Sequence, residues 1–360
     1  MRHVYLAATG QNRGKTTASL GLFDLFLGRG LDAGFMKPVG QRTIIEDGVS
    51  ADEDAVLMRE VFGLTDPMPV MSPVHIPRGF TKAYINGDVV EDLGARVRAA
   101  HGQLAKEHEI ALIEGTGHAG VGAVIGLSNA VVAAMLKAPA VIVSEGGVGR
   151  PIDEIVLNAS HFESHGVEVA GAIVNKVYLD DQPGLVKVLE RGLAPYEIPL
   201  LGVLPYRPIL SNPTLAMVLE GVRGETLHPG PGLDRVVESV AIGAMEPAHM
   251  LDWIGPGTLV IVPGDREDAI LRLTAAHTAG EKAALGLVLT GGYRPSQTVI
   301  DEIRWADLFV TLVAEDTYEV ASEVHDLLVK THAGDVEKIA LIKALVAEWL
   351  DVDRILAVAR

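Results

Sequence analysis

Residues 8–17, reading ATGQNRGKTT, fit most of the phosphate-binding pattern G-x-x-x-x-G-K-[ST]. In that pattern backbone N–H groups surround a phosphate chain and the lysine reaches its terminal oxygens. Lys15 and Thr16 stand in the expected places, whereas Thr9 occupies the place of the first glycine. A strand-like stretch, VYLAAT, precedes the loop and a helix with apolar periodicity follows it. This context favours a nucleotide phosphate site, with the Thr16 hydroxyl on Mg²⁺, over an ordinary strand-to-helix turn.

Charged side chains follow two other expected strands. Glu114 comes directly after IALI, and Lys37 ends the stretch AGFMK. Because open parallel sheets bind ligands at the carboxyl ends of their strands, we expect both side chains beside the phosphate site. Asp54, in ADEDAVLM, is either a second carboxylate for Mg²⁺ or an acid favoured at a helix start by the helix dipole. The sequence therefore offers carboxylates and a second cation to a nucleotide site.

The composition excludes several other kinds of site. The sequence has no cysteine, which excludes disulfides, thiolate metal sites and cysteine nucleophiles. A formal net charge of −17 argues against a broad nucleic-acid surface, because phosphate contacts need clustered lysine and arginine. No apolar run is long enough to span a membrane, and the N-terminal residues run into a strand without a signal-peptide layout. We therefore expect a cytoplasmic protein that is not bound to a membrane.

The order of the expected elements predicts an α/β fold. Short strands rich in Val, Ile and Ala alternate with helices over residues 1–207, as in a parallel sheet that is buried on both faces. Residues 208–232 are rich in Gly and Pro and are expected to form a linker. The alternation resumes over residues 233–322, and residues 323–360 are expected to form a helical tail. The predicted architecture is a P-loop-type parallel-sheet domain, a smaller α/β domain and a tail.

Residues 1–207 resemble dethiobiotin synthetase and the dethiobiotin-synthetase-like domain at the front of some phosphate acetyltransferases. The resemblance rests on the loop with Lys15, KPVGQ at Lys37, Asp54, Glu114, AIVNKV and LLGVLPY. The loop of that family has a residue other than glycine at the first position, as Thr9 does here.

The resemblance implies a site for ATP and Mg²⁺. It gives Lys15 and Lys37 catalytic roles at the reacting groups, and it gives the metal to Thr16, Asp54 and Glu114. Asn175 matches an asparagine that recognises adenine, and LLGVLPY matches the segment that closes over the base. The implied nucleotide-binding residues are Thr9, Gly10, Gln11, Asn12, Arg13, Gly14, Lys15, Thr16, Thr17 and Asn175.

The expected acceptor region departs from the dethiobiotin synthetase pattern. GTGHAGVG, which begins after Glu114, and EGGVGRPIDE do not match the substrate residues of that family. By resemblance, the acceptor is a small carboxylate or carbamate that becomes a mixed phosphate anhydride, and the protein is a homo-oligomer, a dimer. The identity of the acceptor stays open, and the loops and the additional domain disfavour dethiobiotin synthesis itself.

Residues from about 230 to 320 resemble a DRTGG domain. Its motif residues appear as GDRED, with Asp265 and Arg266, and as TGG at residues 290–292, each after an apolar strand. The glycines either offer backbone N–H groups to an anion or only form tight turns. Related domains resemble regulatory or association modules. The two domains together match the front part of long phosphate acetyltransferases; the acetyltransferase domain has no counterpart in the sequence, so acetyl transfer is not expected.

Other polar residues are weaker candidates for metal binding or ligand contact. His161 and His165 are four residues apart on an expected helix, but no third metal ligand accompanies them, which favours a solvent-facing helix. His118 and the pair Ser144-Glu145 are candidates for contact with ligand, without a Ser-His-Asp arrangement. Two interpretations of the chain remain: an enzyme that hydrolyses ATP or transfers its phosphoryl group, and a non-catalytic nucleotide sensor that signals through the DRTGG domain.

Overall fold

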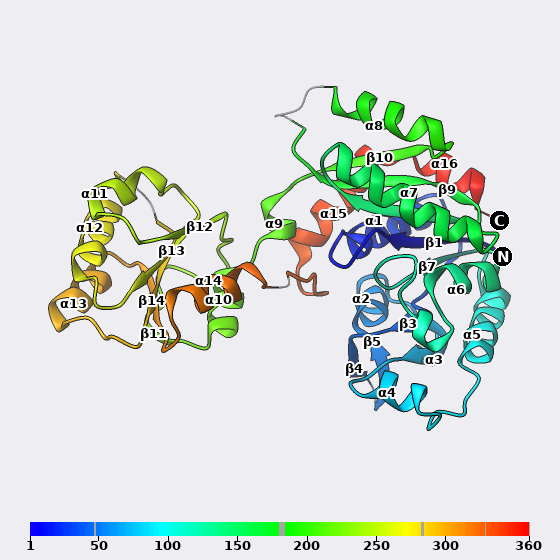
Figure 1. Cartoon of the computed structure of the whole chain (residues 1–360), viewed down its shortest axis with the longest axis horizontal. Coiled ribbons are helices and arrows are strands. Elements are labelled where there is room, and N and C mark those ends of the chain that lie inside the picture. Colours follow the sequence, from blue (N-terminus) through cyan, green and yellow to red (C-terminus); the bar gives the residue numbers. More distant parts are fainter. Residues whose placement is uncertain (47, 180–183, 282–283, 328, 360) are drawn as a thin grey trace. The chain divides into compact units, whose positions relative to one another are not determined.

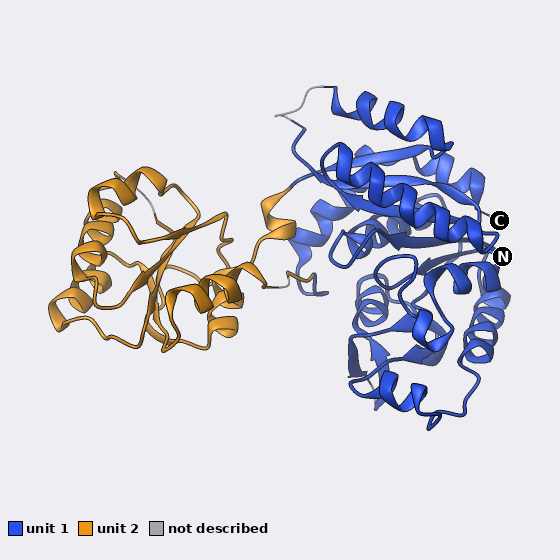
Figure 2. Ribbon diagram, in the orientation of Figure 1, with its two compact units in different colours: residues 1–206, 331–360 blue, residues 207–330 orange. Residues whose placement is uncertain are grey.

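The computed structural model describes residues 1–46, 48–179, 184–281, 284–327 and 329–359. They form two compact units, Met1–Tyr206 with Thr331–Arg360, and Arg207–Lys330 (Figure 2). Each unit has its own sheet, in which most strands run parallel and are covered by helices. The predicted α/β fold is confirmed. None of the helices in the described ranges has the length and apolar character that a membrane span requires.

Six parallel strands form the sheet of the first unit. From one edge to the other they are β10 (Leu200–Pro205), β9 (Val169–Val177), β8 (Ala140–Glu145), β1 (Arg2–Ala8), β7 (Ile110–Glu114) and β2 (Ala33–Met36). Their apolar residues are buried on both faces, as expected for a parallel sheet. Leu6 of β1 lies opposite Glu114, and Ala8 lies opposite Val143. The carboxyl ends of β7, β1 and β8 are therefore neighbours.

Helices cover both faces of this sheet (Figure 1). On one face the core is formed with α5 (Leu93–Glu107), α6 (Asn129–Leu136), α7 (Gly149–Ser164) and α8 (Leu185–Leu193). On the other face α1 (Lys15–Gly28) contacts β1, β7 and β2, and it packs against α15 (Val336–Trp349). Gly21 permits this close packing, since a Cβ atom there would lie 2.2 Å from Cβ of Val346.

The C-terminal helices belong to the first unit. After α15 the main-chain N–H of Asp351 donates to the carbonyl oxygen of Leu201 at 2.8 Å, and Leu350 forms an isolated antiparallel bridge with Gly202. The last helix, α16 (Val352–Val358), also contacts β10. The part of the expected tail from Thr331 onward therefore covers the outer edge of β10 and completes the helical layer beside α1. The expected start of the tail at residue 323 differs from the structure, because residues 323–325 end α14 (Thr317–His325) of the second unit.

Short elements, most of which the sequence patterns do not predict, fill the region between β2 and α5. Two small sheets, one of β3 and β6 and one of β4 and β5, lie there with three helices. Their bounds are β3 (Val39–Gly40), β4 (Thr43–Glu46), β5 (Val49–Asp52), α2 (Glu53–Phe62), α3 (Met68–Met71), β6 (Val74–His75) and α4 (Phe80–Ile85). Single 3-10 turns are η1 (Ala123–Ile125) and η2 (Ala194–Tyr196). The β4–β5 hairpin leads directly into α2, which carries Asp54.

The second unit has a five-stranded sheet in the order β11-β15-β14-β13-β12. The strands are β11 (Glu225–His228), β12 (Ser239–Ile242), β13 (Thr258–Pro263), β14 (Gly286–Thr290) and β15 (Phe309–Leu312). Only β11 runs antiparallel to its neighbour. One face packs with α11 (Pro247–Met250), η3 (Leu251–Trp253), α12 (Glu267–Thr278) and α13 (Gln297–Trp305). The other packs with α10 (Leu215–Val222) and α14 (Thr317–His325).

Residues 208–232, expected to form a linker, contain structure of their own. They hold α9 (Pro208–Ser211), α10 and β11, and the last two contribute to the core and sheet of the second unit. Thr214 caps α10, because its hydroxyl accepts a hydrogen bond from the N–H of Met217. Gly and Pro in this segment mark turns between short elements. They do not mark an unstructured connection.

Candidate functional site

The loop between β1 and α1 has Thr9 at the place where the phosphate-binding pattern has its first glycine. Its positive φ angles are at Asn12, 59°, and Gly14, 95°, whereas Thr9 is outside the left-handed region. A side chain at position 9 is therefore unstrained. The Thr9 hydroxyl lies 3.1 Å from Oγ of Ser144 and donates to Glu154 at 2.9 Å. The unexpected threonine thus ties the loop to β8 and α7.

Asn175 fixes the other side of the loop. Its Nδ2 donates to the carbonyl oxygen of Arg13 at 3.1 Å, and a Cβ atom on Gly14 would lie 1.9 Å from that nitrogen. Asn175 is placed there by β9, where it stands opposite Glu145 of β8. Gly14 is therefore required twice, for its left-handed backbone and for the close approach of the asparagine amide.

Lys15 is the first residue of α1 and is buried within the loop. Its side chain reaches back so that Nζ donates to the carbonyl oxygen of Gly10 at 3.5 Å. Burial lowers the pKa of Lys15 to about 8, and the positive charge of Lys37 adds to this effect. An anionic ligand in the loop would favour the charged ammonium again.

Lys37 connects the two predicted metal-binding carboxylates. Its Nζ donates to Oδ2 of Asp54 at 2.6 Å, to Oε1 of Glu114 at 2.8 Å and to the carbonyl oxygen of Gly115 at 3.3 Å. Burial alone would lower the pKa of Lys37, but Asp54 and Glu114 outweigh it and hold the pKa well above the usual value. The structure thus brings together a lysine from the end of β2, an acid from α2 and an acid from β7.

The two acids differ in environment. Asp54 accepts a hydrogen bond from the Thr16 hydroxyl at 3.0 Å; burial would raise its pKa, but Lys37 and these hydrogen bonds hold it at about 2. Glu114 is fully buried, and its Oε2 accepts a hydrogen bond from Ser19 at 2.5 Å. Burial raises the pKa of Glu114 to about 7, with Lys37 acting in the opposite direction. Thr16, Asp54 and Glu114 therefore belong to one connected cluster.

Several contacts within the site have no signal in the sequence pattern. Ser19 is one small residue inside α1, and only the fold shows that it holds Glu114. Asp52 is buried and caps α2 by accepting from the N–H of Asp54 at 3.1 Å. Arg13 pairs with Glu145 and lies 3.7 Å from Glu154, which is far away in the sequence. A helix-start pattern at Asp52 was the one feature that could have been found from the sequence.

The remaining predicted residues have varied positions. Gln11 is exposed and Thr17 is half-buried. His118 is exposed, and its Nδ1 accepts from the N–H of Gly120 at 3.2 Å in its own loop. The rings of His161 and His165 are 4.8 Å apart. Among the described residues, no group of three or more His, Cys, Asp and Glu side chains is arranged to hold a metal ion.

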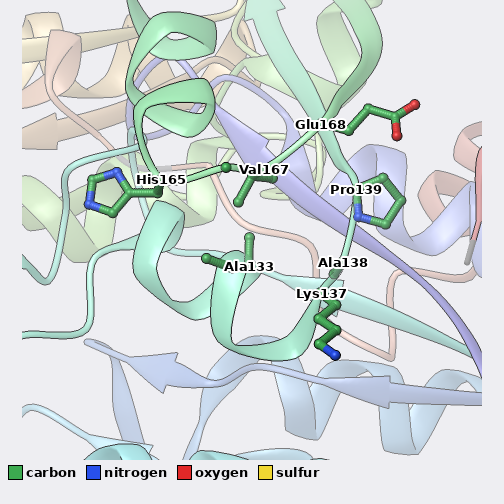
Figure 3. A pocket seen from close by; sticks show the side chains of 9 residues that line it. Ala133, Lys137, Ala138, Pro139, His165, Val167 and Glu168 are labelled. Carbon is green, nitrogen blue, oxygen red and sulfur yellow. The ribbon is translucent and has the colours of Figure 1, made fainter.

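A pocket of about 210 Å³ lies in another part of the first unit (Figure 3). It is formed where α6 leads into β8 and where α7 leads into β9, at the opposite ends of the strands from the loop with Lys15. The charged or polar side chains of Lys137, His165 and Glu168 point in different directions in Figure 3. The full lining is Ala133, Ala134, Lys137, Ala138, Pro139, His165, Gly166, Val167 and Glu168. Nothing there converges on a ligand.

In the second unit, carboxylate side chains of the chain itself bind the polar groups of the DRTGG-like motif. Arg266 pairs with Asp268 at 2.9 Å, and Glu267 accepts from the N–H of Ser296 at 2.6 Å at the start of α13. The hydroxyls of Thr290 and Thr317 are 2.8 Å apart. These contacts show how the motif organises strand-to-helix turns, and the anion-binding interpretation stays a prediction.

Comparison with family models identifies both units. Residues 2–214 match AAA_26, described as an AAA domain, which is more than half of the chain. The chain belongs to the AAA_26 family. Residues 217–327 of this AAA_26 protein match the DRTGG domain. The predicted succession of a phosphate-loop domain and a DRTGG domain is confirmed.

Curated relatives of the AAA_26 chain are named phosphate acetyltransferase. The protein of Pseudomonas putida is 28% identical over 98% of this chain and 51% of its own length. That of Deinococcus radiodurans is 27% identical over 98% of this chain and 50% of its own length. The chain spans about half the length of the curated relatives that it matches. It corresponds to the N-terminal part of long phosphate acetyltransferases, as the two domains predict.

Solved structures also align with parts of the AAA_26 protein. The MinD cell division protein of Aquifex aeolicus has 15% sequence identity and a TM-score of 0.38, and covers 58% of this chain and 84% of its own. The CBS and DRTGG domains of the Clostridium perfringens pyrophosphatase, solved in complex with the activator diadenosine tetraphosphate, have 16% identity and a TM-score of 0.27. They cover 44% of this chain and 82% of their own.

Proposed function

We propose that the first unit binds ATP with Mg²⁺, and that it hydrolyses ATP or transfers the γ-phosphoryl group to a small carboxylate or carbamate. The observation that carries the proposal is the cluster at the carboxyl ends of β1, β2 and β7. Lys15 and Lys37 supply cations there, and Asp54 and Glu114 supply carboxylates within 2.8 Å of Lys37 Nζ. Membership of the AAA_26 family supports the nucleotide part of the proposal.

The donor atoms fit magnesium. Mg²⁺ prefers oxygen ligands and is usually held by one or two carboxylates together with phosphate oxygens and water. The cluster offers a hydroxyl from Thr16 and carboxylates from Asp54 and Glu114, and the hydrogen bond of 3.0 Å between Thr16 and Asp54 keeps two of these donors side by side. We assign the metal to these three residues. The bound ion would neutralise charge on the β- and γ-phosphates.

The residues of the chain position and neutralise the phosphates. The N–H groups of residues 10–16 would bind the phosphate oxygens, and Lys15 would leave Gly10 to contact the terminal phosphate. In the reaction the bond from the γ-phosphorus to the bridging oxygen breaks, and a bond forms to an oxygen of water or of the acceptor carboxylate. Lys37, beside this position, would balance the negative charge that develops.

The adenine would bind beside Asn175. The amide nitrogen of Asn175 is used by the carbonyl oxygen of Arg13, which leaves its Oδ1 to accept from the adenine amino group. Three residues along the chain, Tyr178 stacks on Tyr206 with ring centroids 4.6 Å apart, and Tyr178 is 54% exposed. This exposed aromatic face follows β9 and offers a surface for a base.

The proposal is tested by calorimetric titration of the chain with ATP in the presence of Mg²⁺. Wild-type protein should bind, and Lys15→Ala should lose binding with unchanged circular dichroism. Lys187→Ala, which changes an exposed lysine on α8, is the control and should bind as wild type does. Equal ATP affinity in the Lys15→Ala and control variants would remove the phosphate-loop assignment.

A nucleotide sensor without catalysis is the second candidate, and the DRTGG match over residues 217–327 favours it. ATP turnover measured with a panel of carboxylate and amine metabolites, 7,8-diaminononanoate included, separates the two functions. Turnover stimulated by one compound supports the enzyme, whereas ATP binding without turnover by any of them supports the sensor. For either function we propose a cytoplasmic homo-oligomer, and the dimer inferred from the dethiobiotin synthetase resemblance is part of this proposal.

A further inference from the structure

The two edges of the second unit's sheet differ in chemistry. At one edge, β11 has an irregular register with β15, and it carries ion pairs from Glu225 to Arg294 and from His228 to Asp307, each 2.8 Å long. Register shifts and charged side chains protect an edge strand from pairing with another chain. At the other edge lies β12, which within the described residues pairs with β13 alone (Figure 1).

The edges of the first sheet are also protected. The isolated bridge between Gly202 and Leu350 covers β10 on its outer side, and all four residues of β2 are buried. By contrast, Val240 and Ile242 of β12 are 44% and 46% exposed, and the segment from Ser239 to Ala244 contains no charged residue. An exposed, apolar and uncharged edge is the combination that leads to strand pairing.

The hydrogen bonds with β13 show which main-chain groups of β12 face outward. Ala241 lies opposite Val260, and the N–H of Gly243 donates to the carbonyl oxygen of Ile261 at 2.7 Å. In a parallel ladder alternate residues direct both polar groups to the same neighbour, so Ala241 and Gly243 face β13. The N–H groups of Val240 and Ile242 and the carbonyl group of Val240 consequently face away from the sheet.

We propose that β12 pairs with β12 of a second copy of this chain, in antiparallel direction about a two-fold axis. The outward polar groups set the register, because the residues that exchange hydrogen bonds must both face outward. Val240 then lies opposite Ile242 of the second copy, and Ala241 meets its own equivalent on the axis. The two five-stranded sheets become one continuous sheet across the dimer. This inference uses the second unit only and does not depend on nucleotide binding.

Charge favours a second copy and this register. The chain carries a formal net charge of −17, so two copies carry charge of the same sign, and an uncharged strip is where they approach at the least electrostatic cost. Pairing Val240 with its own equivalent would set Ile242 against Glu238. Pairing Ile242 with its own equivalent would disturb the turn in which the N–H of Ala244 donates to Ile242 at 2.8 Å. The register centred on Ala241 avoids the first conflict and keeps the turn, because the carbonyl oxygen of Ile242 accepts from Val240 of the second copy through its second lone pair.

Disulfide trapping tests the pairing, since the sequence contains no cysteine to interfere. Oxidation with copper phenanthroline and dissolved oxygen removes two electrons and two protons from a pair of thiols as the S–S bond forms. Ala241→Cys should give a disulfide-linked dimer, because facing residues of this kind have Cα atoms about 4.5 Å apart, within disulfide range. Val240→Cys alone should react at least about tenfold more slowly, because its two copies are more than about 7 Å apart.

A mixture of Val240→Cys and Ile242→Cys proteins should form the mixed dimer quickly, which distinguishes this register from random collision. Adding Val240→Lys to Ala241→Cys should abolish the link by placing a charge on the edge. The proposal is overturned if Ala241→Cys links no faster than Val336→Cys, an exposed position on α15, or if Val240→Lys leaves the rate unchanged. Sedimentation of the unoxidised proteins should show the same loss of the dimer in Val240→Lys.

Discussion

The ammonium nitrogen of Lys37 lies 2.8 Å from Oε1 of Glu114, and the two side chains are 4% and 0% exposed. An ion pair that is removed from water depends on both partners, because either charge alone would remain buried without compensation. Lys37 also pairs with Asp54 at 2.6 Å. One lysine therefore holds two carboxylates that would otherwise repel each other at the proposed metal site.

Lys37→Met should destabilise the first unit by about 3–5 kcal/mol, since it leaves Glu114 and Asp54 near each other without a cation. Urea denaturation measures the change. The double variant Lys37→Met with Glu114→Gln should recover part of the loss, because one of the two uncompensated charges is also removed. A double variant no more stable than the single one would show that the ion pair is not the cause.

Glu114→Gln should weaken the Mg²⁺ dependence of ATP binding by about tenfold or more, which corresponds to about 1.4 kcal/mol. The reason is the loss of one of the two proposed carboxylate ligands. Calorimetric titrations of ATP at several Mg²⁺ concentrations measure this dependence directly and need no turnover. Glu107→Gln, at the exposed end of α5, serves as the control. An unaltered Mg²⁺ response in Glu114→Gln would exclude Glu114 from the metal site.

Gly14→Ala should lose ATP affinity and stability together. An alanine at φ 95° carries strain of about 1–2 kcal/mol, and its Cβ would displace the Asn175 amide. Gly28→Ala is the control, because Gly28 ends the helix that follows Gly14 and has nothing within 4 Å of the added Cβ. It should be neutral or stabilising. Thermal unfolding and ATP titration of both variants check the prediction; similar behaviour of the two would contradict it.

Thr9→Gly restores the first glycine of the usual phosphate-loop pattern, and it should bring no gain in ATP affinity. The backbone of Thr9 is outside the left-handed region, so a glycine there would relieve no strain. The Thr9 hydroxyl donates a hydrogen bond to Glu154 at 2.9 Å. Loss of that hydrogen bond and the added chain flexibility should cost about 1–2 kcal/mol in the free energy of unfolding. Tighter ATP binding by Thr9→Gly than by wild type would show that threonine impairs the loop.

The first unit should become less stable in mild acid because of His101. Burial lowers the pKa of His101 to about 4, and the neighbouring His3 and the N-terminal amine add to the effect. The ring of His3 lies 5.2 Å from that of His101. In the unfolded chain His101 should titrate near the ordinary histidine pKa of 6.5. A proton then binds the unfolded chain more tightly than the folded one. The contribution of the neutral His101 to the free energy of unfolding is therefore fully present above pH 6.5 and is lost as the pH falls toward 4.

Urea midpoints at pH 7.5, 6 and 5 measure this effect. His101→Gln cannot take up the proton, so its midpoint should fall less with pH than that of wild type. His332→Gln, at an exposed position, is the control and should follow wild type. Parallel pH profiles for wild type and His101→Gln would assign the acid sensitivity to other groups.

The sequence predicted those parts of the site that follow from strand ends. Glu114 comes directly after the apolar residues IALI, and Lys15 begins the helix after the apolar strand β1. Parallel strands bring their carboxyl ends together, and with them these two residues. Ser19 could not be predicted, because its partner Glu114 is 95 residues away in the sequence and only the packing of α1 on β7 joins them. Arg13 and Glu154 are a similar case. Arg13 lies in the loop after β1 and Glu154 in α7, the helix after β8. Only the pairing of β1 with β8 in the sheet brings these two segments together.

The elements of the second unit show a different limit. The three apolar strands β13, β14 and β15 have clear sequence signals, whereas the edge strands β11 and β12 are less buried and lie among Gly and Pro. Short edge strands lack the alternating pattern of a half-buried strand, so neighbouring turns dominate their signal. The segment expected to be a linker therefore contains the strand and helix that complete the second sheet and its core.

The return of residues 331–360 to the first unit fixes the order in which the chain can mature. Val346 packs at the place left by Gly21, and Leu350 covers β10, so the first sheet lacks its last layer until these residues leave the ribosome. Contacts between such distant parts of a chain form slowly during folding. The second unit, Arg207–Lys330, is a continuous segment and is synthesised entirely before that layer. Translation thus delivers the whole DRTGG domain before the first unit can complete its fold, although that unit begins earlier in the sequence.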